Sequence, residues 1–176
     1  KGTPFTYVEI PETVTEIGDS AFAGCKLSKV TLPAKLKKIG KNAFKGNEIQ
    51  KLSIPGTVEV IPSAAFAQEK AVLTELTLGE GIQEIQAEAF ANSALTKVNL
   101  PDSLKTLDKN AFKRTGTEKI VLYTNVEHSF PTSEYHQVKS NLGDWNDKDF
   151  TYDETGKVVT GFTEIGKKKA EDNHNL

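Results

Sequence analysis

The sequence predicts an α/β solenoid, a right-handed coil of parallel strands and short helical turns, from two periodic features. Phenylalanine recurs at intervals of 22, 22, 24 and 22 residues, at Phe22, Phe44, Phe66, Phe90 and Phe112. A proline or glycine keeps the same intervals, at Pro11, Pro33, Pro55, Gly79 and Pro101. A unit this short cannot bury its own apolar side chains. We therefore expect the units to stack, with the phenylalanines forming a ladder through the core.

Residues 11–32 give the template of the repeat, P-x-x-φ-x-x-φ-G-x-x-A-F-x-x-x-x-L-x-x-φ-x-φ, where φ is an aliphatic residue. Residues 5–10 match its last six positions, so the chain enters in the middle of a repeat. Five full repeats follow, over residues 11–32, 33–54, 55–78, 79–100 and 101–122. The third is two residues longer, between Phe66 and Leu73, where an alanine-rich composition favours a longer helical turn.

Two local signals define the elements of each repeat. The last four template positions alternate apolar and polar residues, which is the period of a half-buried strand, and the next proline ends that strand. The segment around Gly18 to Phe22 has a polar residue just before Ala-Phe, which predicts one turn of α- or 3₁₀-helix. The alanine leaves room for the turns of neighbouring coils to lie close together.

The repeat pattern stops after Leu122. Residues 132–143 carry an N-cap at Thr132 or Ser133 and a glycine stop, which predicts an amphipathic helix covering the last coil. Residues 150–152 and 157–159 alternate around a turn and predict a hairpin. The expected organisation is therefore a solenoid over residues 1–122, a capping loop and helix over 123–149, and a hairpin and polar tail over 150–176. This last part could also be the lead-in to a further repeat array.

The repeat PETVTEIGDSAFAGCKLSKVTL resembles the BspA-like class of leucine-rich repeats from bacterial cell-surface proteins, and the resemblance covers about residues 5–122. It implies a leucine-rich-repeat solenoid in a secreted or surface protein that adheres to host or neighbouring-cell proteins. The general leucine-rich pattern has Asn or Cys where this sequence has Lys35. The nearest stand-in is the third residue after Phe, which is Cys25, Asn47, Ser93 and Thr115 in successive copies. Cys25 is therefore expected to be a small inward or turn-capping residue, not a reactive thiol.

Composition excludes several classes of function. The net charge is −2 with lysines and acids interspersed along the repeats, which indicates no nucleic-acid partner. The apolar runs are far too short to cross a bilayer, so no direct membrane insertion is expected. The single cysteine rules out an intramolecular disulfide framework. Because the chain begins with Lys1 and has no leader, we expect a monomeric fragment of a longer protein.

No catalytic or metal site is expected. The chain contains none of the nucleophile, phosphate-binding or zinc-protease motifs, so we predict no enzyme activity and no cofactor. Histidines are isolated outside the repeats, at His128, His136 and His174. Four acids have the alternate spacing of a calcium loop, Asp144, Asp147, Asp149 and Asp153. Tyr152 stands where an EF-hand needs its glycine, which favours solvated loop acids.

Binding residues are sought on the outward side of the predicted strands, where side chains form two columns across the coils. The first column is Tyr7, Lys29, Lys51, Glu75, Lys97 and Lys119, and the second is Glu9, Thr31, Ser53, Thr77, Asn99 and Val121. The candidate binding residues are Tyr7, Lys29, Thr31, Lys51, Ser53, Glu75, Thr77, Lys97, Asn99 and Lys119. Lysines and hydroxyls suit an acidic protein patch or an anionic polymer. They also keep an exposed sheet soluble, and the face lacks the Trp and Arg that anchor tight interfaces.

Three functions remain open at this point. The first is a non-enzymatic adhesion or protein-interaction module of a bacterial surface or secreted protein, binding host or neighbouring-cell proteins. The second is a structural spacer within a larger surface protein. The third is a glycan-binding or accessory domain of an extracellular enzyme, located in the segment after Leu122.

Overall fold

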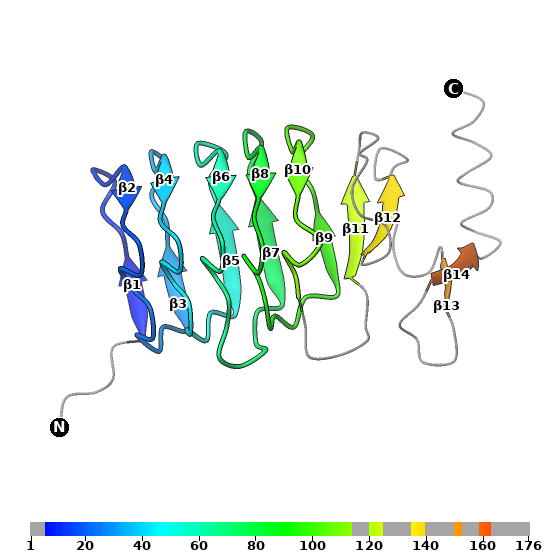
Figure 1. Ribbon diagram of the computed structural model, residues 1–176, viewed down its shortest axis with the longest axis horizontal. Helices are drawn as coiled ribbons and strands as arrows, with labels where there is room; N and C mark the ends of the chain where they lie inside the picture. Colours follow the sequence, from blue (N-terminus) through cyan, green and yellow to red (C-terminus); the bar gives the residue numbers. More distant parts are fainter. Residues whose placement is uncertain (1–5, 114–119, 125–134, 140–149, 153–158, 163–176) are drawn as a thin grey trace.

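A computed structural model describes residues 6–113, 120–124, 135–139, 150–152 and 159–162 (Figure 1). The coils stack along one axis and contribute strands to two faces, and the strands within each face run parallel to one another. The first face carries β1 (Tyr7–Glu9), β3 (Lys29–Thr31), β5 (Lys51–Ile54), β7 (Glu75–Leu78), β9 (Lys97–Asn99), β11 (Ile120–Thr124) and β12 (Tyr135–Lys139). The second carries β2 (Glu16–Ile17), β4 (Lys38–Ile39), β6 (Val60–Ile61), β8 (Glu84–Ile85) and β10 (Thr106–Leu107). A parallel-strand solenoid of about five turns is therefore confirmed.

The phenylalanine ladder lies where the repeat predicts it. Successive rings have centroids 5.1, 5.2, 5.8 and 5.3 Å apart and lie nearly parallel, in the stacked arrangement of aromatic pairs. Phe44, Phe66 and Phe90 are at most 2% exposed, because they have a ring on each side. Phe22 is half-buried, since it begins the stack. The strand residues Leu52, Ile54 and their counterparts complete the same core.

The prediction of short helical turns is wrong, because no helix occurs among the described residues. The segment from Gly18 forms two successive tight turns, in which the Ala21 amide donates to the Gly18 carbonyl and the Ala23 amide to Ser20. The amide between them, of Phe22, donates to Ala43 in the next coil at 2.8 Å. Every second amide of this segment therefore donates its hydrogen bond to the next coil. In an α-helix these amides would donate to carbonyls of their own segment.

A left-handed residue makes these turns possible. The residue two before each of the first four phenylalanines has φ of 55° at Ser20, 56° at Asn42, 54° at Ala64 and 60° at Glu88. A positive φ at the third position of a turn is the feature of type II turns, where Gly and Asn are favoured. None of these four residues is glycine, so the stacking of the coils maintains a conformation that costs L-residues energy.

The prediction of a capping helix over residues 132–143 is also wrong, because Tyr135–Lys139 is strand β12. It pairs in parallel with β11, from Ile120 beside Tyr135 to Thr124 beside Lys139. Without it, β11 would leave a row of backbone groups unpaired, and pairing that edge outweighs the local helical pattern. The other residues of the expected helix lie outside those the structure describes.

The fifth repeat has a different register from the template. Val121 lies beside Lys97 and Leu122 beside Val98, whereas the template places Ile120 beside Val98. The fifth coil therefore contains two more residues than expected, as the third does. After it, β13 (Phe150–Tyr152) pairs antiparallel with β14 (Val159–Phe162), with a bulge at Thr151/Tyr152. The described part of the second expected strand is Val159–Phe162, and Lys157 lies outside the described residues.

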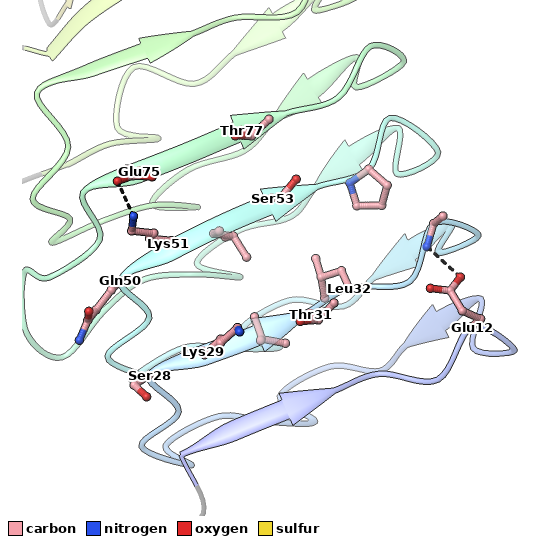
Figure 2. Close-up of a pocket in the computed structure, with 14 residues that line it drawn as sticks. Glu12, Ser28, Lys29, Thr31, Leu32, Gln50, Lys51, Ser53, Glu75 and Thr77 are labelled. Carbon is pink, nitrogen blue, oxygen red and sulfur yellow. Dashed lines mark hydrogen bonds and ion pairs between the residues drawn. The ribbon is translucent and has the colours of Figure 1, made fainter.

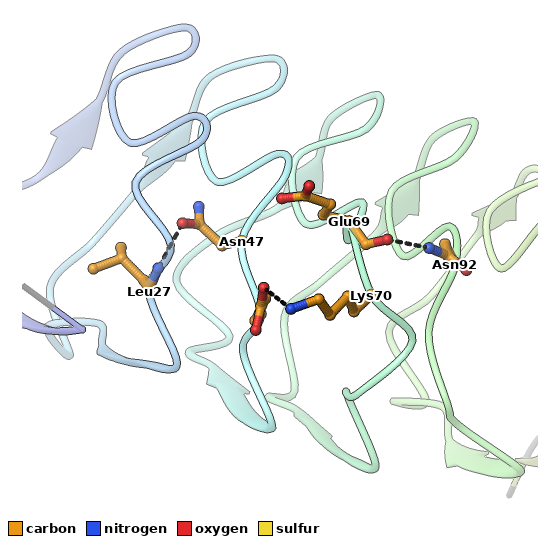
Figure 3. Close-up of polar contacts among 6 residues, drawn as sticks. Leu27, Asn47, Glu69, Lys70 and Asn92 are labelled. Atoms are coloured by element: carbon orange, nitrogen blue, oxygen red, sulfur yellow. Dashed lines mark hydrogen bonds and ion pairs between the residues drawn. The ribbon is translucent and has the colours of Figure 1, made fainter. Parts of the chain in front are cut away.

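Asn47, the third residue after Phe44, is buried and forms a polar link between coils. Its side chain is 1% exposed, accepts from the Leu27 amide at 2.9 Å, and donates to the carbonyls of Phe22 and Phe44 at 2.8 Å each (Figure 3). Ser93 is also buried, while Thr115 lies outside the described residues. An inward position for Cys25 is wrong, because this thiol in the first coil is exposed and contacts the Ala23 carbonyl of its own turn at 3.8 Å.

Candidate binding face

The outward residues of the first face come together in rows fixed by the strand register. Tyr7 lies beside Lys29 and Glu9 beside Thr31 in β1 and β3. In β5 and β7, Lys51 lies beside Glu75 and Ser53 beside Thr77. The residues between them, such as Val30 and Leu52, are buried, so strand alternation directs these polar side chains to solvent.

The end of both columns differs from the sequence prediction. Val121 follows Lys97 in the first column, and Tyr123 follows Asn99 in the second. Lys119 lies outside the described residues. The expected place of Val121 beside Asn99 is wrong, because the fifth coil has two additional residues. Tyr123 is 7% exposed, so the second column ends on a buried aromatic residue and not on an exposed one.

Two of the lysines on this face have partners within the chain. Lys29 Nζ lies 5.0 Å from the centre of the Tyr7 ring, which is within cation–π range. Lys51 Nζ lies 2.8 Å from Glu75 Oε1, and both side chains remain mostly exposed. An exposed pair of this kind contributes little to stability, but it removes one positive charge from the face. The face is therefore of mixed charge.

A shallow groove of about 860 Å³ crosses the face between β3 and β5 and reaches β7 (Figure 2). Thr31, Ser53 and Thr77 lie in a row along it, with Leu32 and Pro55 among the apolar lining residues. At one end, the Glu12 carboxylate accepts from the Ala34 amide at 3.2 Å.

Hydrogen-bonding groups on this face differ in whether they are already used. The Thr31 hydroxyl lies 3.4 Å from the Tyr7 hydroxyl. The side chains of Ser53, Thr77 and Asn99 have no hydrogen bond, and the Lys97 ammonium has no ion pair, among the residues that the structure describes. These four side chains are available to a partner.

The insertion of the third repeat is held by polar contacts to the neighbouring coils. The Gln68 side chain donates to the Ile49 carbonyl and accepts from the Leu73 amide at 2.8 Å. Asn92 donates to the Glu69 carbonyl at 3.0 Å, and Lys70 pairs with Glu48 at 2.8 Å (Figure 3). The hydrogen bond to Glu48 raises the pKa of Lys70 above its ordinary value. Sequence reasoning missed Gln68 because it lies two, not three, residues after Phe66.

Other kinds of site find no support in the described residues. No group of three His, Cys, Asp or Glu side chains lies where it could hold a metal ion. The side chains of the three histidines and of the acids at 144, 147, 149 and 153 are not among those described. A search of this part of the chain for a helix of the length and apolarity needed to cross a membrane found none.

Comparison with known proteins agrees with the repeating coil. The model of the BspA type leucine-rich repeat region matches residues 1–128 in six copies. Searches of curated proteins and of solved structures gave no match. The family match spans well over half of the 176 residues and coincides with the stacked coils. The chain belongs to the BspA type leucine-rich repeat family.

Proposed function

We propose that this chain is a non-enzymatic protein-interaction and adhesion module of a bacterial surface or secreted protein, which binds host or neighbouring-cell proteins through the first strand face. The observation that carries the proposal is the groove across β3, β5 and β7, beside which Ser53, Thr77, Lys97 and Asn99 keep unused polar groups. Family membership supports it, because such repeats commonly take part in protein interaction.

The shape and chemistry of the groove favour a protein partner over a small molecule. Small-molecule sites are mostly enclosed and apolar, with a few converging polar groups. This groove is shallow, mixes charges of both signs, and continues as rows across several coils. Solenoids use such extended surfaces to contact other proteins. The row of hydroxyls offers donors and acceptors without the cost of desolvating charges.

The test introduces large side chains into the groove. As a control, it introduces the same side chains on the second strand face. Ser53→Arg and Thr77→Arg introduce long side chains into the row, and Thr15→Arg and Thr106→Arg introduce them at exposed positions near β2 and β10. Binding to a panel of purified extracellular-matrix proteins and cell-surface ectodomains would be measured by biolayer interferometry. We expect the groove variants to weaken binding at least about tenfold and the controls less than about twofold, at unchanged melting temperature.

Equal loss in both pairs of variants would remove this face from consideration. If the wild-type chain bound no member of the panel and no partner on intact cells, the result would favour a structural spacer. Binding by the full chain that the groove variants leave unchanged but that substitutions within residues 123–176 abolish would place the activity in the segment after the solenoid, as the third function requires.

A further inference from the structure

Lysine is concentrated in one coil, although the chain as a whole has a net charge of −2. Residues 26–51 contain eight lysines and one acid, Glu48, whereas residues 6–25 contain four acids and no lysine. We call the eight the lysine belt: Lys26, Lys29, Lys35, Lys37, Lys38, Lys41, Lys45 and Lys51. All eight side chains are exposed. The local positive charge of this coil, and not the net charge of the chain, would therefore attract an anion.

The fold directs the belt outward. Between Lys35 and Lys41 the chain passes from a turn through β4 to the next turn, and the residues buried in this stretch are Leu36, Ile39 and Gly40. The lysines at 35, 37, 38 and 41 consequently follow the outer edge of the coil. Lys37, Lys38 and Lys41 line a second shallow groove, of about 810 Å³, beside the exposed Val60.

Most of the belt is not neutralised within the chain. Lys51 pairs with Glu75, and Lys29 lies over Tyr7. For the other six, no ion pair or hydrogen bond of the ammonium group occurs within the described residues.

Acids of the neighbouring coils border the belt without joining it. Glu16 is the strand neighbour of Lys38, and Asp19 and Glu59 line the second groove. Asp19 uses its carboxylate to accept from the backbone amide of Lys41 at 2.8 Å. None of these three acids forms an ion pair with a belt lysine in the described part of the chain. The ammonium groups therefore stay available to an external polyanion.

We propose that the belt, centred on Lys35, Lys37, Lys38 and Lys41, binds a linear anionic polysaccharide carrying sulfate or carboxylate groups. Lysine acts as a point charge on a flexible stem, which suits a polymer with regularly spaced anions. Single-stranded nucleic acid needs aromatic stacking platforms, and no aromatic or Arg side chain lines the second groove. Duplex DNA is stiff over about 150 base pairs, whereas the belt bends around a coil, which a flexible chain can follow.

Heparin is the probe for the test, because it is a linear sulfated polysaccharide. Its affinity would be measured by isothermal titration calorimetry at several salt concentrations. One variant changes the lysines at 35, 37, 38 and 41 to Gln. Its control makes the same change in net charge elsewhere, at Lys105, Lys109, Lys113 and Lys157. Circular dichroism and melting temperatures verify that both variants fold.

We expect heparin to bind the wild-type chain, with an affinity that falls steeply as salt increases. The belt variant should lose at least about tenfold in affinity, and its slope of log K against log salt should fall by about three, since each contact contributes roughly 0.7 to 0.9. The control should stay within about twofold of wild type. Ser53→Arg and Thr77→Arg should not weaken heparin binding, so this proposal and the protein-binding function can fail separately.

Four results would overturn the proposal. These are no heparin binding at about 50 mM salt, equal losses in the belt variant and its control, equal or tighter binding of duplex DNA, and tighter binding of anionic lipid vesicles. The second would mean diffuse charge attraction, and the last two would assign the belt to another class of polyanion.

Discussion

Gly40 and Gly18 occupy the same position of successive repeats, but only Gly40 packs against a preceding coil. A Cβ added to Gly18 would meet no heavy atom within 4 Å. A Cβ added to Gly40 would collide with the Asp19 backbone nitrogen and would lie 2.5 Å from the Gly18 carbonyl carbon. Neither glycine has a positive φ, so alanine at both positions differs only in its surroundings.

The expected free-energy changes have opposite signs. Gly18→Ala should stabilise the chain by about 0.4–1 kcal/mol, because alanine restricts the unfolded chain. Gly40→Ala must separate two backbones, and overpacking of this kind costs about 1–3 kcal/mol. The shift would also strain the hydrogen bonds from Gly40 to Ile17 and from Lys41 to Asp19, both 2.8 Å long. The two variants should therefore differ by about 1.5–4 kcal/mol in free energy of unfolding.

Urea denaturation followed by circular dichroism measures this difference, provided that the slope of the transition is the same in both variants. If Gly40→Ala stabilised the chain as Gly18→Ala does, the close contact between the first two coils would be refuted. A cost at Gly18 equal to that at Gly40 would instead mean that the glycine is needed by the turn itself.

Other substitutions test the core, the turns and the polar link by the same denaturation assay. Phe66→Ala should cost about 3–5 kcal/mol, and Phe22→Ala clearly less because its ring is half-buried; a Phe66 loss below about 1 kcal/mol would contradict its burial. Ala64→Gly should be more favourable than Ala67→Gly by about 1–2 kcal/mol, since only Ala64 is left-handed while both are 8% exposed, and equal effects would argue against the left-handed turn. Asn47→Ala should cost at least about 2 kcal/mol, because one buried amide and two carbonyls lose their partner, and a neutral result would show that water replaces the side chain.

The sequence predicted the parts of the fold that depend on the burial of side chains. Phenylalanine spacing predicted the ring stack, and alternation around Val30 and Leu52 predicted which strand residues face inward. The helical turns failed for a different reason. Whether the Phe22 amide bonds within its own turn or to Ala43 of the next coil depends on stacking distance, and a single repeat does not encode that distance.

Errors at the end of the solenoid have a related cause. Ile120 and Leu122 are both apolar and two residues apart, so either could lie beside Val98, and alternation does not distinguish these registers. The helical pattern of residues 132–143 was outweighed by pairing of Tyr135–Lys139 with β11, which no local signal reveals. Charge averaged over the whole chain likewise concealed the lysine belt, which appears when charge is counted over the length of one coil.

The backbone amides of the tight turns that donate to another coil all point the same way along the solenoid. Those of Ser20, Phe22 and Gly24 donate to the second coil, and the equivalent amides of the second, third and fourth coils each donate to the coil that follows. Peptide dipoles in these rows therefore add, as they do along an α-helix. One side of the molecule has an electrical polarity from its first coil to its last, even though the described residues contain no helix.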